Sequence, residues 1–279
     1  MHIPVQDYLY RIASKFETRP GLALLRKRYR LPEGGLAKAF LQRVSKQAEK
    51  RGLEKVELGV VGDYPILLFK PKHKVEGPRL LIVAGFHGNE CASPFAILEY
   101  LDCVKKPSNA FVSFIPLVNP RGFQENVRRN TEGGEPNRHY TKKNDKEICP
   151  EDKILKDHMD MLKGLGKDGI ITLHEDSDVK IDTYAYLYGG KKHKKLTEYL
   201  VRVLHLFFNT KSDGSEVGGG AKTKEAVYQN EHDTSFEEEM SKLGVEPVIT
   251  TETPGGAGFE QRVKAGAVLI ETFIGYSLK

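Results

Sequence analysis

The sequence H-G-N-E at residues 87–90 has the residue types of a metal site. His87 and Glu90 follow an apolar run, residues 79–86, where a predicted strand opens into a loop. An imidazole nitrogen and a carboxylate three residues apart can face one cation there. A surface turn with a glutamate near the next helix N-terminus would give the same pattern. The motif differs from the helical zinc motifs, since Cys91 stands where H-x-x-E-H has its second histidine.

A second histidine of this kind is His174, which ends the apolar segment G-I-I-T-L-H-E at 169–175. Catalytic zinc is commonly held by two histidines and one carboxylate, and its fourth position is left for water. His87, Glu90 and His174 make up such a set. The sequence therefore predicts one zinc ion per chain, held by these three side chains.

A candidate general base is Glu252, which closes the segment E-P-V-I-T-T-E at 246–252 and precedes Pro254. In open α/β sheets, residues at the carboxyl ends of strands project into the crevice that binds ligands. A carboxylate there can take a proton from water, although a strand-end glutamate can also be simply solvated. Because His87, His174 and Glu252 all close apolar strands, a shared site is favoured.

Short apolar runs alternate with segments of helical periodicity after residue 55, which predicts an α/β fold with a mixed, mostly parallel central sheet. The first 55 residues alternate apolar and basic positions at helical spacing and predict a helical N-terminal arm. Helices are also predicted at 93–104, 151–163, 196–208 and 259–276. Residues 121–147 and 209–232 are polar and glycine-containing, and they are predicted to be loops.

Composition excludes several classes of protein. The 279 residues are 39% hydrophobic and 29% charged, which is unlike a disordered, collagen-like or coiled-coil chain. The net charge of +5 comes from scattered charges of both signs, so no nucleic-acid partner is expected. No apolar stretch reaches about 18 residues and no signal peptide is evident, so a cytoplasmic protein without a membrane partner is expected. Three cysteines without a C-x-x-C pair are expected to be reduced thiols.

Three further motifs lie between the metal candidates: N-P-R-G-F at 119–123, R-R-N at 128–130 and N-R at 137–138. With them the chain resembles the zinc carboxypeptidase family of the carboxypeptidase A/B type. That family has, in order, H-x-x-E, N-P-D-G-[YF], R-x-N, N-R, a strand-end His, a Tyr on a mobile loop and a strand-end Glu. Each has a counterpart here between residues 87 and 252. The resemblance implies a three-layer αβα sandwich, with a catalytic domain at 56–279.

The resemblance assigns catalytic roles to residues of this chain. His87, Glu90 and His174 would hold zinc, and Glu252 would act as general base and then as proton donor to the leaving amine. Arg128 would polarise the scissile carbonyl and stabilise the oxyanion, which suits a fixed guanidinium. The implied activity is hydrolysis of the C-terminal amide bond of a peptide, including short or cell-wall-derived peptides.

The resemblance also implies substrate contacts. Asn137 and Arg138 would bind the free C-terminal carboxylate of a peptide substrate, where an arginine offers two parallel donors. Tyr228 matches the mobile tyrosine that closes over bound substrate. The pocket for the terminal side chain would follow Tyr228, and Asp233 there would favour a basic or amine-bearing residue by charge complementarity.

The chain departs from the family pattern at two motifs. Arg121 replaces the usual Asp of N-P-D-G, and Glu135-Pro136 stands where Asp-Leu usually precedes Asn-Arg. Neither change removes a proposed catalytic group. The choice of Arg128 over Arg129 as the substrate-facing arginine rests on the R-x-N spacing to Asn130.

Two other functions fit part of the pattern. The aspartoacylase and succinylglutamate desuccinylase branch has the same constellation and cleaves acyl amides of amino acids. Those relatives carry a further β-rich domain after the catalytic glutamate, whereas only 27 residues follow Glu252 here, which favours a peptidase. A non-catalytic protein that binds a polymer through its basic surface is the second alternative.

Overall fold

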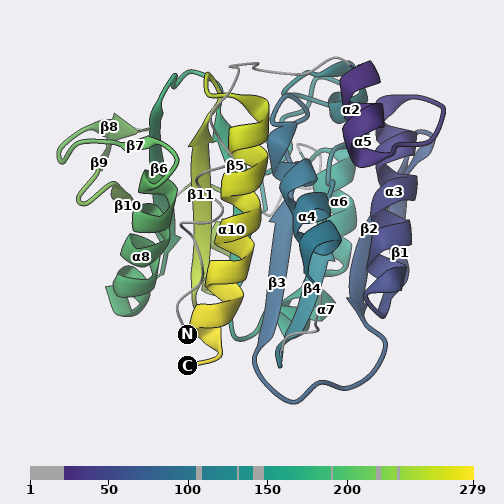
Figure 1. The fold of residues 1–279 in the computed structure, drawn as a ribbon. Helices are drawn as coiled ribbons and strands as arrows, with labels where there is room; N and C mark the ends of the chain where they lie inside the picture. The colour runs from purple at the N-terminus through teal and green to yellow at the C-terminus, as the bar shows by residue number, and fades with distance from the viewer. Residues whose placement is uncertain are drawn as a thin grey trace.

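The computed structural model describes residues 22–104, 109–130, 132–140, 148–189, 191–217, 221–230 and 233–279. In these ranges a nine-stranded mixed sheet runs in the order β1-β2-β4-β3-β5-β11-β6-β10, and β7 pairs with β6 (Figure 1). Pairing is parallel throughout β4-β3-β5-β11, β6-β10 and β6-β7, and antiparallel at β1-β2, β2-β4 and β11-β6. A separate hairpin joins β8 and β9. The strands are β1 (Leu53–Val61), β2 (Tyr64–Pro71), β3 (Arg79–Ala84), β4 (Phe111–Ile115), β5 (Ile170–Asp176), β6 (Asp182–Tyr188), β7 (Asn209–Thr210), β8 (Glu216–Val217), β9 (Ala221–Lys222), β10 (Val227–Asn230) and β11 (Val248–Pro254).

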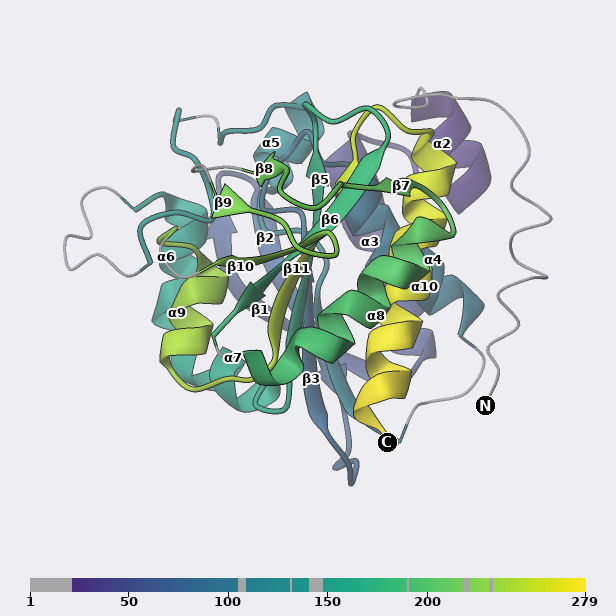
Figure 2. The same cartoon turned by 90° about the vertical axis from the view of Figure 1, so that its left-hand side faces the viewer.

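Helices cover both faces of the sheet, so the molecule has three layers. Figure 2 shows α2, α3, α4, α8 and α10 on one side, and α6, α7 and α9 on the other. This is the αβα sandwich with a mixed, mostly parallel sheet that the sequence predicts. The helices are α2 (Leu22–Tyr29), α3 (Leu36–Lys50), α4 (Ala92–Cys103), α5 (Pro120–Glu125), α6 (Pro150–Asp157), α7 (Met159–Leu165), the 3₁₀ turn η2 (Lys191–His193), α8 (Lys194–His205), α9 (Phe236–Lys242) and α10 (Phe259–Ser277).

The central strands are apolar on both faces because each face is covered. In β3, Leu80 and Ile82 join the core beneath α4 and α10, whereas Leu81 and Val83 join the core beneath α7 and α9. This alternation follows from the two-residue period of a strand. A strand buried on both sides reads as a continuous apolar run, which is why β3 can be recognised in the sequence.

The N-terminal helices pack into the same core as the α/β region that follows them. Phe40 of α3 is fully buried and its ring centroid lies 5.1 Å from that of Phe95 in α4. β1 begins at Leu53, so the boundary predicted at residue 55 falls inside a strand. Residues 1–21 of the predicted helical arm lie outside the described ranges.

Several helix and loop predictions differ from the structure. The helix predicted at 151–163 is divided into α6 and α7 at His158. The predicted loop at 121–147 begins with α5, and the loop at 209–232 contains four short strands. Helix α9 was not predicted, although Ser235 accepts a hydrogen bond from the Glu238 backbone N–H at its start, as the S-x-x-E capping pattern indicates.

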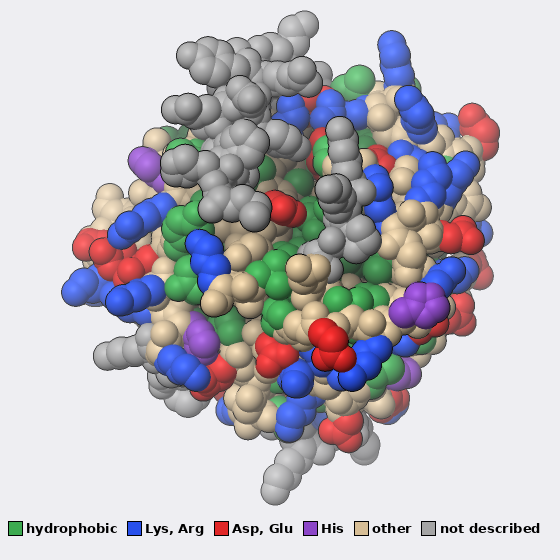
Figure 3. Space-filling view, turned by 60° about the horizontal axis from the view of Figure 1, so that its bottom comes forward, with side chains coloured by type: hydrophobic (Ala, Val, Ile, Leu, Met, Phe, Trp, Pro, Cys, Tyr) green, Lys and Arg blue, Asp and Glu red, His purple; other side chains and the backbone are tan. Residues whose placement is uncertain are grey.

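On the face in Figure 3, Lys and Arg side chains lie among Asp and Glu side chains, with hydrophobic side chains near the centre. The cysteines are free thiols, of which Cys91 and Cys149 are buried and Cys103 is exposed. Within the described ranges, no helix has the length and hydropathy that crossing a membrane requires.

Candidate metal centre and active site

Three neighbouring parallel strands bring the candidate residues to one edge of the sheet. β3 pairs with β5 and β5 pairs with β11, and Glu252 lies directly opposite His174 in register. His87 follows β3 by three residues. Since parallel strands end at the same edge, the three strand-end side chains predicted from the sequence lie together there.

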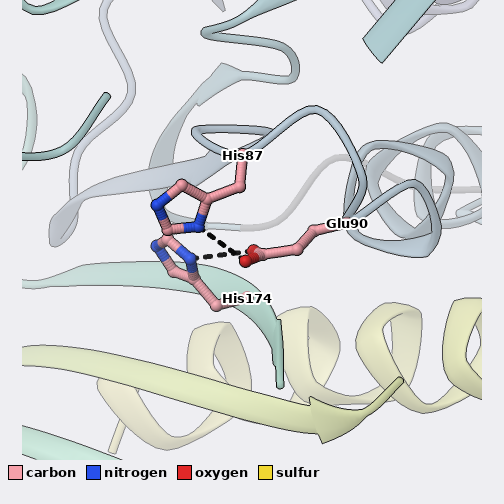
Figure 4. A group of neighbouring side chains, drawn as sticks. All are labelled: His87, Glu90 and His174. Atoms are coloured by element: carbon pink, nitrogen blue, oxygen red, sulfur yellow. Dashed lines mark hydrogen bonds and ion pairs between the residues drawn. The ribbon is translucent and has the colours of Figure 1, made fainter. Parts of the chain in front are cut away.

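Glu90 contacts both histidine rings with one carboxylate. Its Oε1 is 2.6 Å from His87 Nδ1, and its Oε2 is 2.9 Å from His174 Nδ1. Figure 4 shows both rings directed toward this one carboxylate. All three side chains are buried, with relative exposures of 4% or less. One ligand atom from each lies within 4.8 Å of the others.

The ionisation of the three groups follows from their mutual contacts. Burial alone raises the pKa of Glu90, but the two histidines outweigh it and hold that pKa well below its ordinary value. Burial opposes a charge on His174, yet Glu90 and Glu237 raise its pKa to about 10. Burial dominates at His87 and lowers its pKa. The metal-free cluster therefore carries a proton on His174.

This donor set fits a divalent metal ion. Two imidazole nitrogens and a carboxylate are the ligands of many catalytic zinc sites. Each ring directs its Nδ1 toward Glu90, so Nδ1 is the nitrogen that each ring would offer to a cation beside that carboxylate. A cation here would replace the His174 proton as the countercharge of Glu90. The identity of the ion as zinc remains a prediction.

The loop that carries His87 and Glu90 packs directly against α5. A Cβ on Gly88 would lie 1.9 Å from the backbone carbon of Gly122, so only glycine fits at residue 88. The Gly88 N–H also points at the Arg128 carbonyl, 3.4 Å away. Asn119 caps α5 by accepting the Gly122 N–H at 2.8 Å. The H-G-N-E, N-P-R-G-F and R-R-N motifs thus form one packed unit.

Glu175 fixes the helix that follows the metal loop. Its Oε1 accepts the backbone N–H groups of Ala92 and Ser93, at 2.6 and 3.0 Å, at the start of α4. A carboxylate is favourable at a helix N-terminus. The other oxygen forms a buried ion pair with Arg262 of α10. Glu175 follows His174 directly, so this contact ties both histidine-bearing segments together.

Glu252 lines the same cavity as the metal candidates, a cavity of about 960 Å³. Its Oε2 is buried without a hydrogen-bond partner. Burial raises the pKa of Glu252 to about 8, and the charge of Glu90 adds to this effect while His174 opposes it. A carboxylate that titrates near neutrality is suited to general acid–base transfer.

Arg128, and not Arg129, faces the metal cluster. Its Nη1 lies 3.3 Å from Glu90 Oε1, and its Nη2 lies 3.0 Å from Glu135 Oε1. Arg129 is largely exposed and donates to the Gly133 carbonyl. Glu135 also lies 3.5 Å from Arg138 Nη2. The glutamate that departs from the family pattern therefore joins the two cavity arginines.

Asn137 and Arg138 lie in a segment fixed by Asp152. Asp152 accepts both backbone N–H groups and the Tyr140 hydroxyl. Arg138 lines the cavity. The Asn137 amide is engaged elsewhere: it donates to Glu237 at 2.9 Å and accepts the Phe236 N–H at 2.8 Å. A substrate carboxylate would have to displace one of these partners, so in this conformation Arg138 is the better placed to bind it.

Tyr228 and Asp233 also line the cavity. Tyr228 lies on β10, in register with Tyr186 of β6, so it stands on a paired strand instead of the loop that was predicted. Asp233 Oδ2 accepts the Tyr188 hydroxyl at 2.8 Å and the Asn230 amide. Its preference for a basic terminal residue stays a prediction.

Three buried acidic residues around the site were not predicted: Glu175, Asp152 and Glu237. Glu237 is fully buried, and its Oε1 lies 3.6 Å from His174 Nε2. It is the first of three consecutive glutamates in α9. The buried Phe236 and Met240 mark the inner face of that helix, but they do not single out one glutamate in the sequence.

The Gly88 contact gives a first prediction. Gly88→Ala should push the metal loop away from α5, lower the stability by about 1–3 kcal/mol and weaken metal binding. Thermal unfolding and metal content would be measured together. Gly133→Ala, where a Cβ meets nothing within 4 Å but φ is +81°, is the control: its backbone strain should lower the stability without changing metal content. Full metal content in the Gly88 variant would contradict the prediction.

Metal binding should depend on pH. Histidine binds a metal only when its ligand nitrogen is deprotonated. Since Glu90 and Glu237 raise the metal-free pKa of His174 to about 10, binding at neutral pH should release its Nδ1 proton, and affinity should rise as pH rises toward that value. Calorimetric titration of chelator-treated protein with Zn²⁺, in buffers of different ionisation enthalpy, measures this release. The expectation fails if the heat is independent of the buffer.

Comparison with known proteins finds a family profile and solved structures that resemble this chain. The profile of the succinylglutamate desuccinylase/aspartoacylase catalytic domain matches residues 76–186. Candidate metallopeptidases from Shewanella amazonensis SB2B and Shewanella baltica OS155 are both 31% identical and have TM-scores of 0.79 and 0.78. Each alignment covers 86% of this chain, and 93% and 91% of those chains respectively. No curated protein matches significantly.

More distant structures share the fold. A metallo-carboxypeptidase from Burkholderia cenocepacia is 17% identical with a TM-score of 0.63, and the alignment covers 85% of this chain and 67% of that one. The fold and the matching profile are those of hydrolases of the metallopeptidase or deacylase kind. By its identity with the Shewanella proteins over most of both chains, the chain belongs to the zinc carboxypeptidase-like family, which is related to the aspartoacylase branch.

Proposed function

We propose that the protein is a zinc-dependent carboxypeptidase that hydrolyses the C-terminal amide bond of a peptide. The observation that carries this proposal is the shared cavity: the three metal candidates, Glu252 and the two arginines, Arg128 and Arg138, all line it. Bound zinc would supply a Lewis acid and lower the pKa of water. The protein would supply proton transfer, oxyanion binding and substrate alignment.

Glu252 is the proton-transfer group in this proposal. Its buried carboxylate takes a proton from the attacking water and gives it to the leaving amine as the C–N bond breaks. Arg128 stabilises the negative charge that develops on the carbonyl oxygen. A partly buried guanidinium already held by Glu90 and Glu135 needs little reorganisation for this task.

Arg138 determines where the chain is cut in this proposal. It binds the free terminal carboxylate, and so the last amide bond is placed beside the metal cluster. Tyr184, Tyr186, Tyr188 and Tyr228 line the same cavity and give an aromatic wall against which a terminal side chain can pack. Asp233 lies among them and is proposed to favour a basic side chain there.

A deacylase of the aspartoacylase or succinylglutamate desuccinylase type is the second candidate, because the profile of that catalytic domain matches residues 76–186. It would use the same metal, base and arginines on an N-acyl amino acid. Parallel assays of short peptides and N-acyl amino acids distinguish the two functions. A non-catalytic binding protein would turn over neither.

Glu252→Gln should keep the metal and lower kcat/KM by about 10²- to 10⁴-fold. In the unmodified enzyme kcat/KM should fall as pH falls, because the base must be ionised. A bound cation lowers the pKa of a nearby carboxylate, so the acid limb of the pH profile should lie below the metal-free pKa of about 8.

Glu246→Gln, at a position just before β11, is the control for the Glu252→Gln variant. Near-normal turnover by the Glu252 variant would remove it as the base.

Arg138→Ala should raise KM for peptides with a free carboxylate by about 10- to 100-fold, since a hydrogen-bonded charge is lost. The kcat should change less, because Arg138 binds the terminus and not the reacting carbonyl. Arg129→Ala, the neighbouring exposed arginine, should leave KM unchanged. If the unmodified enzyme cleaves free and amidated C-termini equally well, the carboxylate-binding role is refuted.

A further inference from the structure

A buried carboxylate lies behind His174, on the side away from Glu90. Glu237 stands in the first turn of α9 and is fully buried. Its Oε1 lies 3.6 Å from His174 Nε2, the distance of an ion pair, and accepts the Thr250 hydroxyl at 3.3 Å. Although burial raises the pKa of Glu237, His174 and the hydroxyl and amide donors lower it to about 2. The donors around Glu237 therefore favour its charged form.

The His174 ring is held from both ends. Nδ1 faces Glu90, and Nε2 faces Glu237. The ring of Phe86 stacks on it at an interplanar angle of 4°. A carboxylate at the nitrogen that does not bind metal fixes the tautomer and direction of a histidine ligand and makes it more basic. With Nε2 protonated toward Glu237, Nδ1 is the nitrogen available to a cation.

The second oxygen of Glu237 acts on another part of the site. Oε2 accepts the Asn137 amide N–H at 2.9 Å, and the amide oxygen of Asn137 accepts the Phe236 N–H. Asn137 has a positive φ of 64°, a left-handed conformation that asparagine adopts more readily than most residues. Arg138 follows, and its Nη1 donates to the Asn137 carbonyl at 2.8 Å. Glu237 thus also supports the segment that carries Arg138 into the cavity.

We propose that Glu237 is a positioning residue that fixes the metal ligand His174 and, with the same carboxylate, the Arg138 segment. The inference requires the metal site but not peptidase activity. It gives α9 a role in the site although no residue of the helix lines the cavity. A merely structural Glu237 would stabilise the fold and leave metal affinity unchanged, so metal affinity is the property that separates the two roles.

The test is Zn²⁺ binding by chelator-treated protein, measured by competition with a chromophoric chelator. The Glu237→Gln substitution removes the negative charge. The amide N–H₂ of the new side chain is a donor, and it would face another donor, either His174 or Asn137. We expect affinity to fall 10- to 100-fold, the usual effect of removing such a partner. Glu239→Gln, a half-buried glutamate on the same helix, should bind Zn²⁺ like the unmodified protein.

Glu237→Asp keeps the charge but withdraws it by one methylene, and we expect a smaller loss of affinity than for Gln. It also provides the measurement if the Gln variant fails to fold. Thermal unfolding of each metal-free variant is recorded in parallel. Lowered stability with Zn²⁺ affinity within twofold of the unmodified protein would overturn the proposal. The Zn²⁺ assay contains no substrate, so an unchanged affinity in the Glu237 variants would not contradict the proposed peptidase function. Conversely, a lack of peptidase activity in the unmodified protein would not contradict the role of Glu237 in metal binding.

Discussion

The ionised carboxylate of Glu90 is the constraint on which the site depends. An uncompensated charge in a protein interior costs several kcal/mol, and Glu90 is only 2% exposed. Cationic partners offset the desolvation energy of this charge, since His174 and Arg128 both contact the carboxylate. A divalent cation would offset more of that energy. The same burial that makes Glu90 costly therefore creates a strong preference for a metal.

The rest of the architecture can be understood as the support of that carboxylate. Glu90 lies on a loop, and loops are less fixed than strands. Here the loop is held on three sides, by the Gly88–Gly122 contact, by Glu175 at the start of α4 and by His174 at the end of β5. Close packing of this kind holds a ligand set in one geometry, which a catalytic metal requires.

Much of this could be predicted from the sequence. The strand ends at His87, His174 and Glu252 were identifiable because buried parallel strands read as apolar runs that stop abruptly at a polar residue. The contacts of Asn137 could not be predicted in the same way. Its motif indicates a substrate ligand, but its amide direction depends on a backbone φ of 64° and on a partner 100 residues away, Glu237.

Buried polar partners were missed for the same physical reason. Glu237 and Glu239 look alike in the sequence, and only the packing of α9 against β11 decides which is desolvated. Tyr228 shows the opposite case: the sequence names it as a candidate and it lines the cavity. Its place on β10 depends on pairing with β6, which a four-residue segment does not reveal. The local sequence pattern shows which residues a neighbouring layer buries. It does not show which polar atoms will form hydrogen bonds with each other.

The charge balance of the cavity limits which substrates it can accept. Glu135 already joins Arg128 and Arg138, so an anionic substrate enters a site whose arginines are partly neutralised. A substrate carbonyl at Arg128 shares a guanidinium that Glu90 and Glu135 already contact, and a terminal carboxylate at Arg138 must compete with Glu135. This competition lowers the affinity of the cavity for every anion. A substrate that also packs against the cavity tyrosines can recover part of that affinity through those contacts. Under the proposed function, a terminal residue with a sizeable side chain would gain contacts along the tyrosine wall that a small terminal residue lacks.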